Sequence, residues 1–149
     1  MNLSVGEPAP DFTSTDQTGQ PITLSTYRGK KVVLYFYPKD DTPGCTAQAC
    51  SLRDNYEVLQ EAGYEVLGVS VDDESSHQKF IKKFDLPFTL VSDTDHKIVE
   101  DYDVWKEKSM YGRNFMGIVR TTFIIDENGI ISDIISKIDT QNHAEQILK

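Results

Sequence analysis

Residues 32–45 read VVLYFYPKDDTPGC, and this stretch contains the strongest structural signal in the 149-residue chain. Its first six residues are all apolar, β-branched or aromatic, which predicts a central strand buried on both faces. Pro38 ends that strand, and a loop with a Thr-Pro-Gly turn follows. A helical pattern then runs from about Cys45 to Ala62. The order of strand, loop and helix places Cys45 at the carboxyl end of a strand and at the start of a helix.

The chain on either side alternates between strand and helix patterns. An N-terminal β-hairpin is predicted by APDFTSTD and QPITLSTY around a turn at Gly19, and a C-terminal hairpin by VRTTFIID and IISDIISKI around ENG. Two more strands are predicted in YEVLGVSVD and FTLVSD, and helices in DESSHQKFIKKFD, HKIVEDYDV and QNHAEQILK. The segment WKEKSMYGRNFMG has no clear period and predicts an irregular loop with apolar anchors. The pattern predicts one α/β domain, residues 1–149, with a central mixed β-sheet flanked by helices.

The charge balance excludes one class of partner. The chain has 15 basic and 24 acidic residues, a net charge of -9 and a pI near 4.7, so nucleic acid is not expected as a partner. The N-terminus MNLSVGEPAPDF shows no signal peptide, and the longest apolar run is too short to cross a membrane. We therefore expect a cytoplasmic protein, in which two nearby cysteines are catalytic or metal-binding more often than a permanent disulfide.

Cys45 occupies a position that suits a nucleophile. A helix N-terminus presents unpaired N–H groups and about half a positive charge, which favours the thiolate form of a cysteine there. The thiolate is the nucleophilic form, and Thr42 is close enough in the loop to aim a hydroxyl at its target. Free cysteine is also a common buried residue, so a purely structural role is the alternative. The position at the start of the helix favours the nucleophile.

The stretch YPKDDTPGC resembles the peroxiredoxin active-site pattern Pro-x-x-x-Thr-x-x-Cys, which Pro38, Thr42 and Cys45 match. Nearly the whole chain resembles the bacterioferritin comigratory protein, or peroxiredoxin Q, branch, above all in ITLSTYRGKKVVLYFYPKDDTPGCTAQACSLRD and NFMGIVRTTFIIDENG. The resemblance implies a thioredoxin-like fold and a peroxidase that acts on hydrogen peroxide and organic hydroperoxides without metal or organic cofactor. It also implies roles for four residues: Cys45 attacks the peroxide, Thr42 and Arg120 activate it, and Pro38 shields the sulfenic acid.

Cys50 resembles the resolving cysteine of this branch. The resemblance implies an intramolecular Cys45–Cys50 disulfide, recycled by thioredoxin or, in some members, glutaredoxin, in a protein that is often a monomer. Five steps along an α-helix place two Cα atoms roughly 8.6 Å apart, whereas a disulfide requires less than about 7 Å. The two cysteines therefore cannot bond within an intact helix, and we expect the start of the helix to unwind during turnover. The alternative for Cys50 is a buried helix residue without a redox role.

Other functions remain possible at this point. A general thiol–disulfide oxidoreductase would require Cys-x-x-Cys and a cis-proline strand, and neither is evident. A non-catalytic redox sensor or holdase would use the same helix opening without turnover. A zinc-binding module is weaker, because two cysteines supply only half of a structural site.

The remaining polar residues suggest no second site. His77, His96 and His143 are scattered, have no metal-like spacing and are expected at the surface. Asp40 and Asp41 lie in the active-site loop and oppose thiolate formation unless they are solvated or pair with Lys39 or Arg53.

Overall fold

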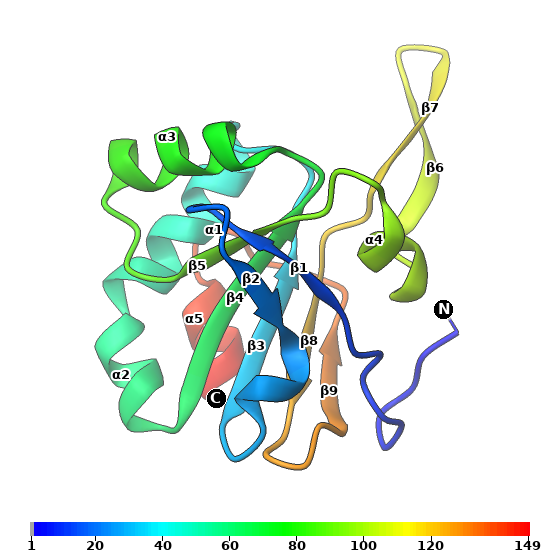
Figure 1. Ribbon diagram of the computed structural model, residues 1–149. Coiled ribbons are helices and arrows are strands. Elements are labelled where there is room, and N and C mark those ends of the chain that lie inside the picture. The colour runs from blue at the N-terminus through cyan, green and yellow to red at the C-terminus, as the bar shows by residue number, and fades with distance from the viewer. Residues whose placement is uncertain (1) are drawn as a thin grey trace.

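Strand β3 (Lys31–Phe36) lies inside a seven-stranded sheet in a computed structural model that describes residues 2–149 (Figure 1). The strand order is β2-β1-β5-β4-β3-β8-β9, and the other members are β1 (Thr13–Asp16), β2 (Pro21–Thr23), β4 (Tyr64–Ser70), β5 (Thr89–Ser92), β8 (Thr121–Ile125) and β9 (Ile131–Ile135). Strands β3, β4 and β5 are parallel, and the remaining pairings are antiparallel. The predicted mixed sheet and both predicted terminal hairpins are confirmed.

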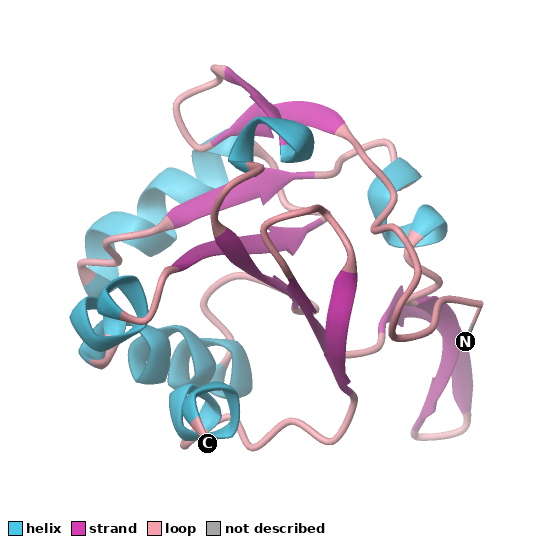
Figure 2. Ribbon diagram, turned by 90° about the horizontal axis from the view of Figure 1, so that it is seen from below, coloured by secondary structure: helices cyan, strands magenta, loops and turns pink. Residues whose placement is uncertain are grey.

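The helices cover the sheet unequally. They are α1 (Pro43–Asp54), α2 (Tyr56–Glu61), α3 (Glu74–Phe84), α4 (Lys97–Asp101) and α5 (His143–Leu148), with a 3₁₀ turn at Leu24–Tyr27. Buried residues of α1, α2, α3 and α5 join one apolar cluster, whereas α4 and the N-terminal segment pack in a second cluster on the opposite face. Figure 2 shows the helices gathered mainly along one side of the strands. None of the helices in residues 2–149 is long and apolar enough to cross a membrane.

Strand β3 belongs to both clusters because successive side chains of a strand point to opposite faces. Val33 and Tyr35 face the helices of the first cluster, and Leu34 and Phe36 face the second. All four side chains are buried, which explains why this strand reads as a continuous apolar run. Because β3 is buried on both faces, it fixes the start of the following loop at the carboxyl end of the strand.

Gly68 in β4 makes room for Tyr35. A Cβ atom on Gly68 would lie 2.8 Å from Cζ of Tyr35 and 2.8 Å from Cδ2 of Leu90, both closer than carbon atoms approach in proteins. The Tyr35 ring can thus pack against β4 only because residue 68 has no side chain.

Two sequence-based predictions of secondary structure are wrong. The single helix predicted to run from Cys45 to Ala62 is two helices, because Asn55 leaves helical geometry at φ -116° and ψ 13° and donates from Nδ2 to the carbonyl oxygen of Ser51, 2.9 Å away. The predicted irregular loop is a hairpin of β6 (Trp105–Met110) and β7 (Arg113–Ile118), which projects from the sheet in Figure 1. Tyr111 and Gly112 both have positive φ, as a two-residue hairpin turn requires.

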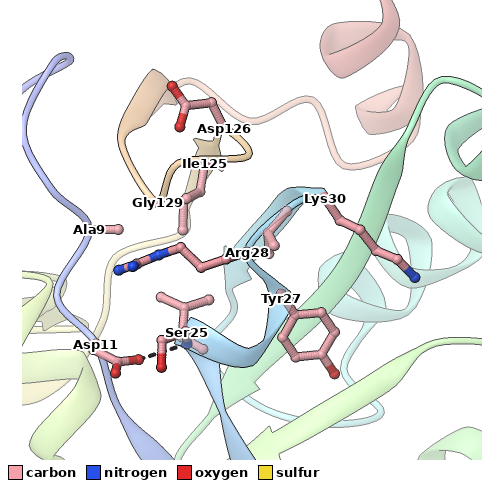
Figure 3. A pocket seen from close by; sticks show the side chains of 11 residues that line it. Ala9, Asp11, Ser25, Tyr27, Arg28, Lys30, Ile125, Asp126 and Gly129 are labelled. Atoms are coloured by element: carbon pink, nitrogen blue, oxygen red, sulfur yellow. Dashed lines mark hydrogen bonds between the residues drawn. The ribbon is translucent and has the colours of Figure 1, made fainter.

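A small pocket lies at the opposite end of β3 from Cys45. Figure 3 shows Arg28 crossing it toward Gly129, where a Cβ atom would lie 2.6 Å from Arg28 Nε. The pocket's volume of about 20 Å³ has room for little more than one water molecule. The six residues of β3 separate this pocket from the loop that leads to Cys45 by about 20 Å. This pocket is therefore not a substrate site for Cys45.

Two of the three histidines are buried, so the prediction that they lie at the surface is wrong. His77 in α3 and His143 in α5 are fully buried, and only His96 is partly exposed, with its ring centroid 4.4 Å from that of Trp105. Each buried ring has polar partners from distant segments. Such partners cannot be inferred from local sequence, because they depend on how the helices dock onto the sheet.

His143 predicts a loss of stability in acid. Burial lowers the pKa of its imidazole, and the nearby Arg120 charge lowers it further. In the unfolded chain the ring titrates near pH 6.5. As the pH falls below about 6.5, the unfolded chain binds a proton that the folded chain does not, so the free energy of unfolding decreases by up to about 1.4 kcal/mol per pH unit. Urea denaturation at pH 7.5, 6 and 5 should show a smaller loss for His143→Gln than for wild type. Equal losses would contradict this prediction.

Candidate active site

Cys45 lies in the first turn of α1 and is 1% exposed. The extended backbone of Thr42 places it at the N-cap, Pro43 follows at the first helical position, and Thr46 N donates to Thr42 O at 2.8 Å. The helix therefore begins two residues earlier than predicted, and the sulfur lies close to its unpaired N–H groups. These N–H groups carry a partial positive charge.

Arg120 contacts the sulfur directly, although 75 residues separate the two in the chain. It lies one residue before β8, and its Nη1 donates to Cys45 Sγ at 3.3 Å and to Gln48 Oε1 at 2.8 Å. Gly44 allows this approach, because a Cβ atom at that position would lie 3.0 Å from Arg120 Nη2. The structure thus brings together two of the predicted site residues.

Thr42 and Pro38 lie on the same loop as Cys45. The Thr42 hydroxyl donates to the carbonyl oxygen of Lys39 at 2.9 Å, which leaves the lone pairs of its oxygen to accept from an incoming O–H group. Thr42 and Pro38 are both half-buried. Both are thus less buried than Cys45.

Cys50 is half-buried, and both cysteines are free thiols. Helix α1 is continuous from Pro43 to Asp54 and contains both of them. That a disulfide between them requires the helix to open stays a prediction.

Three further residues surround the sulfur and were not predicted. Gln48 is fully buried, and its Nε2 has no partner within residues 2–149. The Tyr35 hydroxyl is also buried without a partner in that part of the chain; burial raises the pKa of Tyr35 well above its ordinary value, and the charge of Cys45 adds to this. Burial and the charge of Arg120 lower the pKa of Lys108 in β6, while Cys45 raises it. Of these three residues, only Gln48 could have been predicted from the sequence. It lies three positions after Cys45, and residues with that spacing are neighbours on the same face of a helix.

Of the two ways named in the sequence analysis to offset the aspartates of the loop, pairing with Lys39 or Arg53 does not occur, whereas Asp41 is exposed to solvent. Arg53 instead bonds Asp54 and the carbonyl oxygen of Phe84. The partners of the loop come from α3, and the pairs are Asp40–His77 and Asp41–Lys83. The first pair is buried and the second is exposed.

One trio in residues 2–149 has the spacing of metal ligands. Ligand atoms of Asp40, Asp72 and His77 lie within 4.8 Å of one another. Asp72 Oδ2 already accepts from Asp40 N and from Ser70 Oγ, both at 2.8 Å. The trio therefore satisfies its polar groups without an ion.

Comparison with known proteins connects this geometry to a family. Residues 5–134 match the AhpC/TSA family. The chain belongs to this family. It is 47% identical over 148 residues to a putative peroxiredoxin Bcp from Coxiella burnetii, covering 99% of this chain and 98% of that protein. This membership and similarity make it a peroxiredoxin of the Bcp or peroxiredoxin Q type.

Solved structures of peroxiredoxins have the same fold. A PrxQ variant from Xylella fastidiosa superposes with a TM-score of 0.93 at 33% identity, covering 99% of this chain and 94% of that one. A bacterioferritin comigratory protein from Xanthomonas campestris, studied for its alkyl peroxide reduction activity, gives a TM-score of 0.86 at 36% identity, with 92% and 87% coverage. The thioredoxin-like fold predicted for this peroxiredoxin is confirmed. The protein is a thiol peroxidase, an oxidoreductase that uses a peroxide substrate and a thiol reductant.

Proposed function

We propose that Cys45 is the peroxidatic nucleophile of this peroxiredoxin, with Thr42 and Arg120 as its activating residues. The observation that carries the proposal is the 3.3 Å contact between Arg120 Nη1 and Cys45 Sγ at the N-terminus of α1. Arginine stays charged and presents several donors in a fixed plane, so it stabilises both the thiolate and the charge that develops on a departing oxygen. Pro38, half-buried at the start of the same loop, limits water access to the product.

The first step transfers one oxygen atom. The Cys45 thiolate attacks the outer oxygen of ROOH, the O–O bond breaks, and RO⁻ leaves and takes a proton to become ROH. Cys45 becomes the sulfenic acid, which has lost two electrons to the peroxide. Donors from Arg120 and the lone pairs of Thr42 orient the peroxide for this in-line displacement.

The second step uses Cys50. Its thiolate attacks the sulfenic sulfur of Cys45, hydroxide leaves and takes up the thiol proton as water, and a Cys45–Cys50 disulfide forms. The start of α1 is suited to the opening that this step requires. Thr42 forms no side-chain cap bond and the first helical turn holds no acidic residue, so two common stabilising features are absent from this described part of the chain.

We infer that both hydrogen peroxide and organic hydroperoxides are substrates. The hairpin that supplies Lys108 to the site also carries large exposed apolar side chains, at Met110, Tyr111, Phe115 and Met116. This apolar surface of the β6–β7 hairpin suits the alkyl part of an organic hydroperoxide. The Xanthomonas campestris relative, in which alkyl peroxide reduction has been addressed, supports this assignment.

We also infer that thioredoxin, with glutaredoxin as the alternative, returns the disulfide to two thiols. Both cysteines lie within one chain, so a monomer suffices for the cycle. Residues 1–149 act as one domain, because the two apolar clusters pack on the same sheet. The cytoplasm is the compartment that we propose, since it supplies such a reductant.

A steady-state assay tests this function. Wild type with thioredoxin, its reductase and NADPH is expected to consume many equivalents of hydrogen peroxide or cumene hydroperoxide. A sensor or holdase would stop near one equivalent. Cys50→Ser should consume the first equivalent at the wild-type rate and then lose at least about 90% of thioredoxin-dependent turnover, because its sulfenic acid cannot form the internal disulfide. Full turnover by Cys50→Ser would remove the resolving role.

Amide exchange tests the helix opening. The amides of residues 42–52 are expected to lose protection in the oxidised protein while the strands keep theirs, because the disulfide cannot form across an intact helix. The Cys50→Ser protein treated with one equivalent of peroxide is the matched control, and it should retain the protection of the reduced form. Equal protection of α1 in oxidised and reduced wild type would contradict the opening.

A further inference from the structure

A buried histidine–aspartate pair lies behind the catalytic loop. His77 of α3 is fully buried, with Nε2 3.1 Å from the carbonyl oxygen of Val91 and Nδ1 2.7 Å from Asp40 Oδ2. A carbonyl oxygen only accepts hydrogen bonds, so Nε2 carries a hydrogen. The peroxidase chemistry described above uses neither member of this pair.

The pair therefore holds a second proton. Because Nε2 keeps its hydrogen, the 2.7 Å contact between Nδ1 and Oδ2 requires one more proton between the ring and the carboxylate. That proton yields either imidazolium with carboxylate or imidazole with carboxylic acid, and both combinations have a total charge of zero. Asp40 thus brings no net negative charge to the loop as long as His77 is its partner.

Asp40 forms hydrogen bonds through both carboxylate oxygens and through its backbone N. Oδ1 accepts from Tyr37 Oη at 2.5 Å, Oδ2 also accepts from Ser76 Oγ at 2.8 Å, and the backbone N donates to Asp72 Oδ2 at 2.8 Å. The side chain is 4% exposed. Water therefore screens the Asp40 charge poorly, and only a bonded partner can neutralise it.

Cys45 and Asp40 share a neighbour. Burial raises the pKa of Tyr35, and the charges of Cys45 and Asp40 are the next two causes, so its phenol lies within the field of both. The rings of Tyr35 and Tyr37 stack with centroids 5.4 Å apart, and Tyr37 bonds Asp40. The electric field of an uncompensated charge on Asp40 would therefore act on the Cys45 sulfur through a region of low dielectric constant, where it is weakly screened.

Other charged or titratable groups face this pair from β3, from the loop, from α3 and from the segment before α3: Tyr35, Tyr37, Asp41, Asp72, Asp73, Lys79 and Lys83. Asp41 and Lys83 pair with each other at 2.8 Å with both side chains exposed, so solvent screens them. Within residues 2–149, the ion pair of Asp40 is with His77 alone.

We propose that His77 is a positioning residue of this peroxidase, which holds the Asp40 side of the catalytic loop and keeps it electrically neutral so that Cys45 remains a thiolate. The inference rests on the proposed role of Cys45. It assigns to α3 a part in a reaction whose groups otherwise come from the loop, α1 and the segment before β8. Without His77, a buried carboxylate in the same loop would oppose the negative charge on the sulfur.

The test measures the thiolate of Cys45 as a function of pH. In a Cys50→Ser background, Cys45 is the only thiol, and its rate of alkylation by iodoacetamide follows its thiolate fraction. His77→Gln retains a polar side chain that can donate to Asp40 but cannot carry its proton. We expect the alkylation midpoint to rise by about one pH unit, and single-turnover oxidation by hydrogen peroxide, measured at a pH below both midpoints, to slow about tenfold. An unchanged midpoint in a folded His77→Gln protein would overturn the proposal.

A second substitution separates charge from structure. Asp40→Asn added to His77→Gln removes the uncompensated charge, so the midpoint should return to within about 0.3 pH unit of the parent protein, a twofold change in the thiolate ratio. A merely structural role predicts no return, and that result would overturn the proposal. Lys83→Gln breaks the exposed pair between the same loop and the same helix and is the matched control, with no shift expected.

If circular dichroism shows that His77→Gln does not fold, the alkylation midpoint of Asp40→Asn alone tests the proposal. Asp40→Asn alone replaces one neutral pair by another, so its midpoint should equal that of the parent. A lower midpoint would mean that Asp40 carries net charge in the parent and would overturn the proposal. Because alkylation does not require turnover, failure here is distinct from failure of the proposed peroxidase roles, which Cys45→Ser tests.

Discussion

Replacing Cys45 with serine is expected to lower kcat/KM for hydrogen peroxide by at least about 10⁴-fold. A serine hydroxyl does not ionise at neutral pH and is a weak nucleophile toward peroxide oxygen, even with Arg120 Nη1 in contact with it. No other thiol can replace it, because Cys50 lies five residues further along the same helix and does not contact Arg120 in the structure. The measurement is peroxide consumption with thioredoxin and its reductase.

Cys50→Ser is the control for this result, because it removes one thiol from the same helix and keeps the nucleophile. It should still consume one equivalent of peroxide and form a sulfenic acid that dimedone traps. Serine differs from cysteine by one atom, and α1 should remain intact in both variants, as circular dichroism would verify. Turnover in Cys45→Ser above about 1% of wild type would refute Cys45 as the nucleophile.

Replacing Arg120 with methionine is expected to slow the oxidation of Cys45 by about 10²- to 10³-fold. Methionine retains an apolar stem of similar length but removes the donors to Cys45 Sγ and Gln48 Oε1. The thiolate then loses its one described side-chain hydrogen bond within residues 2–149, and the departing oxygen loses a preorganised cation. Stopped-flow measurement of sulfenic acid formation reports this step directly. Arg120→Lys, which keeps the charge without the planar fork, should fall between methionine and wild type.

Gly44→Ala tests the same contact without changing a polar group. Alanine favours a helix more than glycine by about 1 kcal/mol, so the helix itself should not be weakened. Its Cβ atom would lie 3.0 Å from Arg120 Nη2 and push the guanidinium away from the sulfur. We expect oxidation of Cys45 to slow by about tenfold while the melting temperature is maintained. Wild-type oxidation rates would show that Arg120 does not require this close approach.

Much of the fold followed from periodicity. The continuous apolar run from Val32 to Tyr37 predicts a strand that is buried on both faces, and β3 has that environment. The β6–β7 hairpin was missed for the converse reason. Most of its side chains are exposed, so its strands have no alternation between a buried and an exposed face. Its turn places Tyr111 at positive φ, where a bulky residue is a poor sequence signal.

Some parts of the site could likewise be predicted from the sequence, and others could not. Thr42, Cys45 and Cys50 lie within nine residues, and their spacing along one loop and helix is enough to indicate their possible chemistry. The partners of the loop in α3 were not predicted, since Asp40 and Asp41 pair with His77 and Lys83 rather than with Lys39 or Arg53. Reasoning from local sequence suggests partners that are close in the chain, whereas these pairs join the loop after β3 to helix α3.

The sequence by itself determined the order of strand, loop and helix, and with it the placement of Cys45 at a helix N-terminus. It also determined that Cys45 and Cys50 cannot bond in an intact helix, because the rise per residue of a helix is constant. Only the tertiary structure decided which cation meets the sulfur and which group neutralises Asp40. Both contacts join segments distant in sequence, Arg120 to Cys45 and His77 to Asp40. Such contacts depend on strand register and helix docking, which set where side chains point only after the whole sheet has assembled.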